Sequence, residues 1–129
     1  MKSPVKTIKP FFSDSRGEMS HLLDGNEKFT SAVLITCNKG AVRANHWHKK
    51  DTHYSYMIEG SMEYTYRQVD EDDSKKKTLL VKKGDIVCTP PKTVHAMRFL
   101  EKSVFIALTT EERDQSQYEK DTVRIRLIE

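Results

Sequence analysis

Four of the five histidines of this chain stand at spacings that would let their side chains meet in a β-fold. His46 and His48 are separated by one residue, and since side chains alternate along a strand, both rings would face the same side. His53 opens the next apolar run, and His95 lies on a later one. Imidazole nitrogens suit zinc, iron, nickel, copper and cobalt better than magnesium or calcium. The pattern therefore predicts that one divalent transition metal is bound by His46, His48, His53 and His95.

A chance arrangement has to be weighed against this prediction. A lone histidine on a strand is usually a surface residue or a hydrogen-bonded core residue, and one His-x-His pair carries little weight. Here each block of histidines is bounded by its own turn residues, namely Gly40, Gly60, Gly84 and Pro90. We therefore favour the metal site. The fifth histidine, His21, is expected to be exposed and is given no role.

The elements that must position these histidines are short β-strands. Runs rich in Val, Ile, Thr and Tyr alternate with Gly and Pro, and no window shows a sustained helical stripe. Evenly spaced strands of this kind predict an all-β antiparallel sandwich or barrel, and a closed barrel would bring His95 beside the other three rings. The predicted strands are Ala32–Asn38, Val42–His48, His53–Ile58, Met62–Arg67, Thr78–Val81, Asp85–Cys88, Val94–Leu100 and Val104–Thr109.

Length and composition restrict the remaining possibilities. The 129 residues fit a single domain, residues 1–129. A net charge of +3 is too small to favour binding to nucleic acid or to an anionic membrane. The sequence shows neither an apolar stretch that could span a bilayer nor a secretory signal, and Cys37 and Cys88 are interpreted as buried free thiols. These features together indicate a cytoplasmic protein.

The histidine spacing resembles the two motifs of the cupin superfamily. The patterns G-x5-H-x-H-x4-E-x6-G and G-x5-P-x-G-x2-H-x3-N match Gly40–Phe99, with three departures: His53 for the glutamate ligand, Lys92 for the glycine, and Phe99 for the asparagine. The resemblance implies an all-β fold, the antiparallel double-stranded β-helix of the cupin jelly-roll barrel. It also implies that the histidines, with His53 in place of the glutamate, are the metal ligands.

A second resemblance points to one group of cupins. Phe12–Gly17 (FSDSRG), Val42–Lys49 (VRANHWHK) and Tyr118–Arg124 (YEKDTVR) are similar to segments of cupins that epimerise or isomerise nucleotide-linked keto-sugars. These are the dTDP-4-dehydrorhamnose epimerase-like group, the sugar ketoisomerases, and the zinc-binding cupin domain of capsular polysaccharide reductase–epimerases. A simple turn with an exposed ion pair is the alternative for Asp14–Gly17. The resemblance implies a nucleotide sugar as substrate and zinc as the metal, with iron, nickel, manganese or cobalt as alternatives.

The chemistry implied by this resemblance is removal of a proton beside a sugar carbonyl. Because a histidine bound to metal cannot also take the proton, another group must act as acid or base. Alternation places two tyrosines on one interior face, where they are either catalytic or core aromatics: Tyr64 and Tyr66. Four further residues share the parity of the histidines and are expected to line the substrate pocket: Ser55, Met57, Met97 and Phe99.

Two other functions stay open at this point. An iron- or nickel-dependent cupin dioxygenase would also use a histidine-rich site with open positions. A barrel that binds a small molecule without catalysis is the third possibility, and a saturated four-histidine site would favour it. In each case the partner is a small molecule. A homodimer is expected through sheet edges, to which the amino-terminal segment and Val123–Leu127 could contribute strands.

Overall fold

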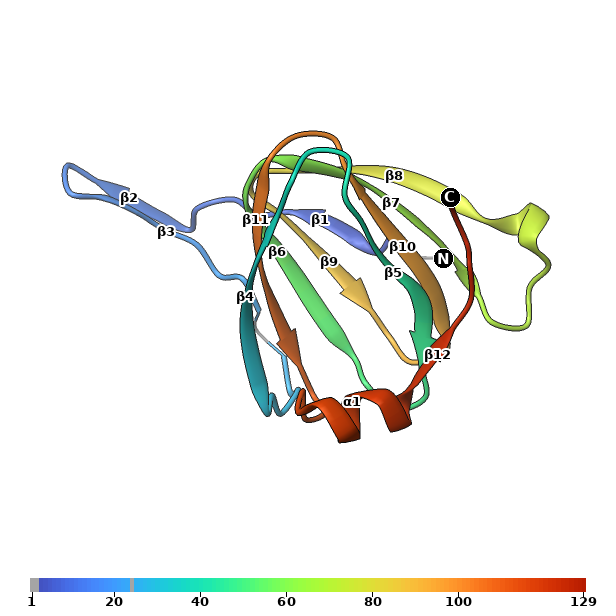
Figure 1. Cartoon of the computed structure of the whole chain (residues 1–129). Helices are drawn as coiled ribbons and strands as arrows, with labels where there is room; N and C mark the ends of the chain where they lie inside the picture. Colours follow the sequence, from blue (N-terminus) through green and yellow to red (C-terminus); the bar gives the residue numbers. More distant parts are fainter. Residues whose placement is uncertain (1–2, 24) are drawn as a thin grey trace.

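The computed structural model describes residues 3–23 and 25–129. This part of the chain holds twelve strands, one α-helix and one 3-10 turn (Figure 1). The elements are β1 (Val5–Thr7), β2 (Phe12–Asp14), β3 (Gly17–Met19), β4 (Ser31–Cys37), β5 (Val42–His48), β6 (His53–Glu59), β7 (Ser61–Gln68), η1 (Asp73–Lys75), β8 (Lys77–Lys82), β9 (Asp85–Thr89), β10 (Thr93–Phe99), β11 (Ser103–Thr109), α1 (Gln115–Asp121) and β12 (Thr122–Arg124).

Two five-stranded antiparallel sheets form the barrel, in the orders β1-β9-β6-β11-β4 and β12-β5-β10-β7-β8. The sheets face each other, the β2–β3 hairpin projects away from them, and α1 crosses one end of the barrel (Figure 1). The central strands bury alternate side chains, and the core includes Met57, Met62, Tyr64, Phe99 and Phe105. The prediction of an antiparallel all-β fold is therefore confirmed.

All eight strands predicted from the sequence are present, as β4 to β11, with bounds that differ by no more than one residue at either end. The helix α1 was not predicted, because its seven residues include no buried one and form no apolar stripe. It begins instead at a capping residue, Asp114, whose side chain accepts a hydrogen bond from the backbone N–H of Gln117. Within the described residues, no helix has the length and apolar character needed to cross a membrane.

The two segments proposed for a dimer contact are the outermost strands of their sheets. β1 pairs with β9, and β12 pairs with β5 through Val123 and Trp47. The homodimer through these sheet edges stays a prediction. Cys37 and Cys88 are both free thiols; Cys37 is buried as expected, whereas Cys88 is only half-buried.

A β-bulge in β5 sets the position of the first histidine. His46 pairs with His95, but the register then shifts so that Asn45 is the extra residue. Ala44 and Asn45 adopt left-handed backbone, with φ of 71° and 55°. The Asn45 side-chain oxygen accepts hydrogen bonds from the backbone N–H groups of residues 127 and 128. The bulge thus places His46 directly opposite His95 and is tied to the C-terminal segment.

The turn between β6 and β7 requires a glycine. Gly60 has a φ of 90°, and a Cβ there would lie 2.1 Å from Ser103 Oγ and 2.7 Å from the Lys102 carbonyl oxygen. We expect Gly60→Ala to lower the free energy of unfolding by about 2–4 kcal/mol, since strain and overpacking add. Gly84→Ala is the matched control, because Gly84 has a φ of 91° but open space around its Cβ. Urea unfolding measures the stability of both variants. Equal losses of unfolding free energy would show that the contact with Ser103 and Lys102 adds nothing to the backbone strain.

Candidate metal centre

The structure brings the four predicted histidines together inside the barrel. His46 and His48 come from β5, His53 from β6 and His95 from β10, and all four side chains are buried. The ring centroid of His46 lies 4.6 Å from that of His48 and 4.8 Å from that of His95. The ring of His53 lies 5.4 Å from that of His48 and 5.1 Å from that of His95. Strand alternation and barrel closure produce this convergence.

Hydrogen bonds decide which ring nitrogen carries the proton on two of these histidines. His53 Nδ1 lies 3.2 Å from Oδ2 of Asp51, and His95 Nδ1 lies 2.9 Å from the carbonyl oxygen of Thr93. An ionised carboxylate and a carbonyl can only accept, so Nδ1 is the donor in both rings. The lone pair of each neutral ring is therefore on Nε2.

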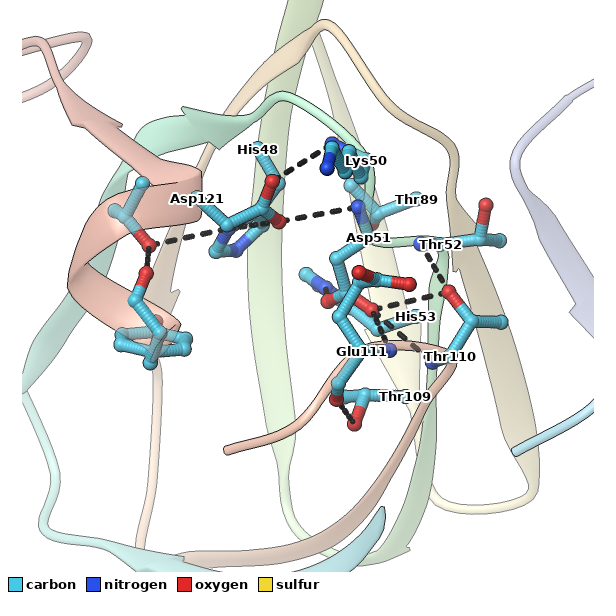
Figure 2. A network of polar contacts seen from close by, with 12 residues as sticks. His48, Lys50, Asp51, Thr52, His53, Thr89, Thr109, Thr110, Glu111 and Asp121 are labelled. Atoms are coloured by element: carbon cyan, nitrogen blue, oxygen red, sulfur yellow. Dashed lines mark hydrogen bonds and ion pairs between the residues drawn. The ribbon is translucent and has the colours of Figure 1, made fainter. Parts of the chain in front are cut away.

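In His48 too, Nδ1 carries the proton and the lone pair is on Nε2. Its Nδ1 lies 3.2 Å from the hydroxyl oxygen of Thr122, and that hydroxyl donates its own proton to the Tyr118 carbonyl at 2.6 Å. The hydroxyl must therefore accept from His48 Nδ1. Figure 2 shows the polar contacts that link His48 and His53 to the turn after β5 and to the C-terminal part of the chain.

Three buried ring nitrogens have no hydrogen-bond partner within the described part of the chain: His46 Nδ1, His48 Nε2 and His95 Nε2. An unpaired buried polar atom costs about 1–3 kcal/mol, so such atoms indicate a missing partner. These same three residues can place one ligand atom each within 4.8 Å of one another. His53 belongs to a second group of that kind with His48 and Asp51. The donor set therefore fits a transition-metal ion.

The electrostatics of the cluster keep the imidazoles of His46, His48 and His95 neutral. Burial lowers the pKa of His46 to about 3 and that of His48 to about 4, and neighbouring histidines lower both further. The pKa of His95 is also well below its ordinary value, again mainly because of burial. Burial raises the pKa of Asp51, but the hydrogen bond and charge of His53, the backbone N–H of Glu111 and the charge of His48 together lower it below its ordinary value, so the carboxyl is ionised. Neutral imidazoles can bind a metal without first losing a proton.

The cavity beside the histidines has a volume of about 60 Å³. Two of the four predicted pocket residues line it. Ser55 and Met97 line it, together with His46, His53 and His95. The other two predicted pocket residues do not line this cavity: Met57 and Phe99 are fully buried in the hydrophobic core. Their parity along the strands was assigned correctly, but alternation says nothing about depth, and both lie where core side chains fill the barrel.

The two predicted catalytic tyrosines do not reach this cavity. Tyr64 is fully buried and its hydroxyl lies 2.7 Å from Thr89 Oγ1, while the Tyr66 ring stacks on it at 5.5 Å. Burial raises the pKa of Tyr64, which works against a role as a base. Neither tyrosine is among the residues that line the cavity. The core-aromatic alternative is the one that their positions favour.

Tyr118, on α1, is one of the cavity residues that reasoning from the sequence missed. Its ring lies 5.4 Å from that of His48 and 6.2 Å from that of His46. The guanidinium of Arg113 lies 4.5 Å from the centre of the Tyr118 ring, and Arg113 and Arg43 also line the cavity. The only sequence signal was the resemblance of residues 118–124, which assigned no role to the tyrosine.

Comparisons with solved structures identify the fold. The chain is similar to a 3,4-ketoisomerase from Helicobacter canadensis, with a TM-score of 0.74 and 16% identity over 95% of this chain and 92% of that one. It is also similar to the sugar 3,4-ketoisomerase QdtA from Thermoanaerobacterium thermosaccharolyticum in complex with TDP, with a TM-score of 0.69 and 23% identity over 96% and 90%. The cupin-type barrel predicted from the motifs is thereby confirmed.

A third similar structure is the capsular polysaccharide assembling protein CapF from Staphylococcus aureus, with a TM-score of 0.68 and 20% identity. The match covers 92% of this chain but only 34% of CapF. No curated protein sequence matched the chain. The family model described as the polysaccharide biosynthesis C-terminal domain matches residues 12–123. The chain shares its cupin-type barrel with the three solved structures. By the family match, the chain belongs to the polysaccharide biosynthesis C-terminal domain family.

Proposed function

We propose that this chain is a metal-binding cupin that epimerises or isomerises a nucleotide-linked keto-sugar in polysaccharide biosynthesis. The observation that carries the proposal is the buried set of unpartnered imidazole nitrogens beside a cavity. The family match supports the polysaccharide context, and the similar 3,4-ketoisomerases support a sugar carbonyl as the reacting group. The two finer parts of the proposal, the metal and the substrate, are argued separately below.

The metal would be held by His46, His48 and His95, with His53 as the fourth candidate ligand. Zinc is the first choice, since the ligands are neutral imidazoles; iron, nickel, manganese and cobalt are the alternatives. When bound, such an ion supplies Lewis acidity that stabilises negative charge on a carbonyl oxygen. The chain itself fixes the rings through acceptors behind Nδ1 and excludes water by burying them.

Two arginines at the cavity would recognise the diphosphate of a nucleotide sugar. Arg43 and Arg113 both line it, and guanidinium groups bind phosphate through paired, charge-assisted hydrogen bonds. Arg43 is held in place from the side: its Nη2 donates to the Thr36 carbonyl at 3.0 Å and its Nε contacts Cys37 Sγ at 3.1 Å. Arg113 rests on the Tyr118 ring, so phosphate binding there would also act on the tyrosine.

We assign proton transfer to the Tyr118 hydroxyl. Burial raises the pKa of Tyr118, although the charge of Arg113 lowers it in part, so the hydroxyl is protonated near neutral pH. It can therefore return a proton to the carbon after a base has removed one there, and the phenolate that is left takes a proton from water. Tyr118→Phe should leave zinc content unchanged and reduce turnover by about 100-fold or more. Tyr66→Phe is the control; an equal loss in that variant would return the role to β7.

Deuterium incorporation tests the proposed activity. The zinc-loaded protein is incubated with nucleotide-linked 4-keto-hexoses in deuterated water, and the sugars are analysed by NMR and mass spectrometry. We expect deuterium at C3 or C5 of at least one sugar, because the acidic C–H bonds lie beside the carbonyl. No incorporation with any such sugar would count against the proposal. Iron-dependent oxygen consumption would instead identify the dioxygenase alternative.

A further inference from the structure

Asp51 lies behind the histidine cluster, in the turn between β5 and β6, and its side chain is buried. One carboxylate oxygen, Oδ2, is 3.2 Å from His53 Nδ1. The other, Oδ1, accepts from the backbone N–H groups of Thr110 and Glu111 at 3.0 and 3.2 Å, and from the Thr110 hydroxyl at 3.3 Å (Figure 2). Asp51 therefore touches a candidate ligand on one side and the C-terminal segment on the other.

Among the three histidines whose Nδ1 is held, only His53 has a charged acceptor at hydrogen-bond distance within residues 3–23 and 25–129. His95 uses a backbone carbonyl and His48 uses the Thr122 hydroxyl. The carboxylate of Asp121 lies 3.8 Å from His48 Nδ1, which is too long for a hydrogen bond. Four neutral imidazoles alone would leave the charge of a divalent cation uncompensated in a buried site, and Asp51 is the buried carboxylate closest to them by these contacts.

We propose that Asp51 is a positioning residue for the metal site: its carboxylate keeps the His53 proton on Nδ1, leaves the Nε2 lone pair for the ion, and supplies the negative charge through the imidazole. This inference rests on the metal part of the proposed function. An oxygen that orients a ligating histidine from behind raises the basicity of the ring, and its loss lowers metal affinity by about 10–100-fold.

The substitution Asp51→Asn separates this role from a purely structural one. Three donors point at the Oδ1 position, so the introduced amide must place its oxygen there and its NH₂ group toward His53. Nδ1 of His53 then has to accept, and the ring proton moves to Nε2. Zinc affinity, measured by competition with a chromophoric chelator, should fall by about 10–100-fold in D51N.

Two further variants make the test specific. Thr110→Val removes the hydroxyl that donates to Asp51 but leaves the His53 contact in place, so zinc affinity should stay within about twofold of wild type. His53→Glu brings its own carboxylate to the site, so adding D51N to H53E should also change the affinity by no more than about twofold. Equal losses from D51N in both backgrounds, or from T110V and D51N alike, would overturn the proposal.

The tautomer of His53 can also be measured directly, and its value in the wild-type protein does not depend on how the variants fold. Long-range ¹H–¹⁵N NMR of the chelator-treated chain reports the tautomer of each histidine. We expect His53 as the Nδ1–H form in wild type and the Nε2–H form in D51N. An Nε2–H form in wild type, or unchanged zinc affinity in D51N, would refute the role of Asp51. Wild-type protein that binds no zinc would instead refute the metal part of the proposed function, and the tautomer would still test Asp51.

Discussion

Replacing His95 by asparagine should lower the zinc affinity of the chain by about 100-fold or more. Loss of a residue that only orients a ligand costs about 10–100-fold, and loss of the ligand itself should cost at least as much. Asparagine can place its amide nitrogen where Nδ1 of His95 donates to the Thr93 carbonyl, so that hydrogen bond is kept. It cannot replace Nε2, the fully buried nitrogen that has no partner in the described protein. The variant therefore removes one ligand atom and little else.

His21 provides the control for this prediction. Its ring is exposed and stacks on Phe11 with a centroid separation of 4.3 Å, and within the described residues it belongs to neither group of candidate metal ligands. His21→Asn should keep the zinc content and affinity of wild type. Elemental analysis of protein purified without added metal, followed by chelator competition, measures both quantities. Wild-type zinc affinity in H95N would show that His95 is not a ligand of the ion.

The histidine cluster could be predicted because its geometry depends on rules that act over short distances. Alternation along a strand puts His46 and His48 on one face, and a closed antiparallel barrel brings β6 and β10 next to them. The strands β4 to β11 could be predicted from turn residues and β-branched runs, because these signals are also local in the sequence. These features need only the period of a strand and the positions at which the chain reverses.

The supporting residues could not be predicted because their partners are distant in the chain and leave no periodic pattern. Thr122, which accepts from His48 Nδ1, is 74 residues away from it, and Asp51 contacts Thr110 across 59 residues. Tyr118 lies on a helix with no buried residue, so no hydrophobic stripe marks it. Which nitrogen of each imidazole is free depends on these partners, and therefore on the tertiary structure rather than on the motif.

The metal-free protein should lose stability steeply as the pH falls from 6.5 toward 5. In the unfolded chain a histidine has a pKa of about 6.5, whereas burial lowers the pKa of His46 to about 3 and that of His48 to about 4. Between these values the unfolded state binds protons that the folded state does not, so the free energy of unfolding decreases as the pH decreases. Each such histidine contributes up to about 1.4 kcal/mol per pH unit.

The pH range from 6.5 to 5 isolates the histidines, because ordinary carboxylates, with pKa values of about 4, stay ionised throughout it. Urea unfolding at several pH values in this range gives the slope of stability against pH. H95N should have a smaller slope than wild type, since the pKa of His95 is also well below its ordinary value. Equal slopes in wild type and H95N would mean that His95 takes up its proton in the folded state. The cluster would then be open to water, and its imidazoles would bind protons in competition with the metal.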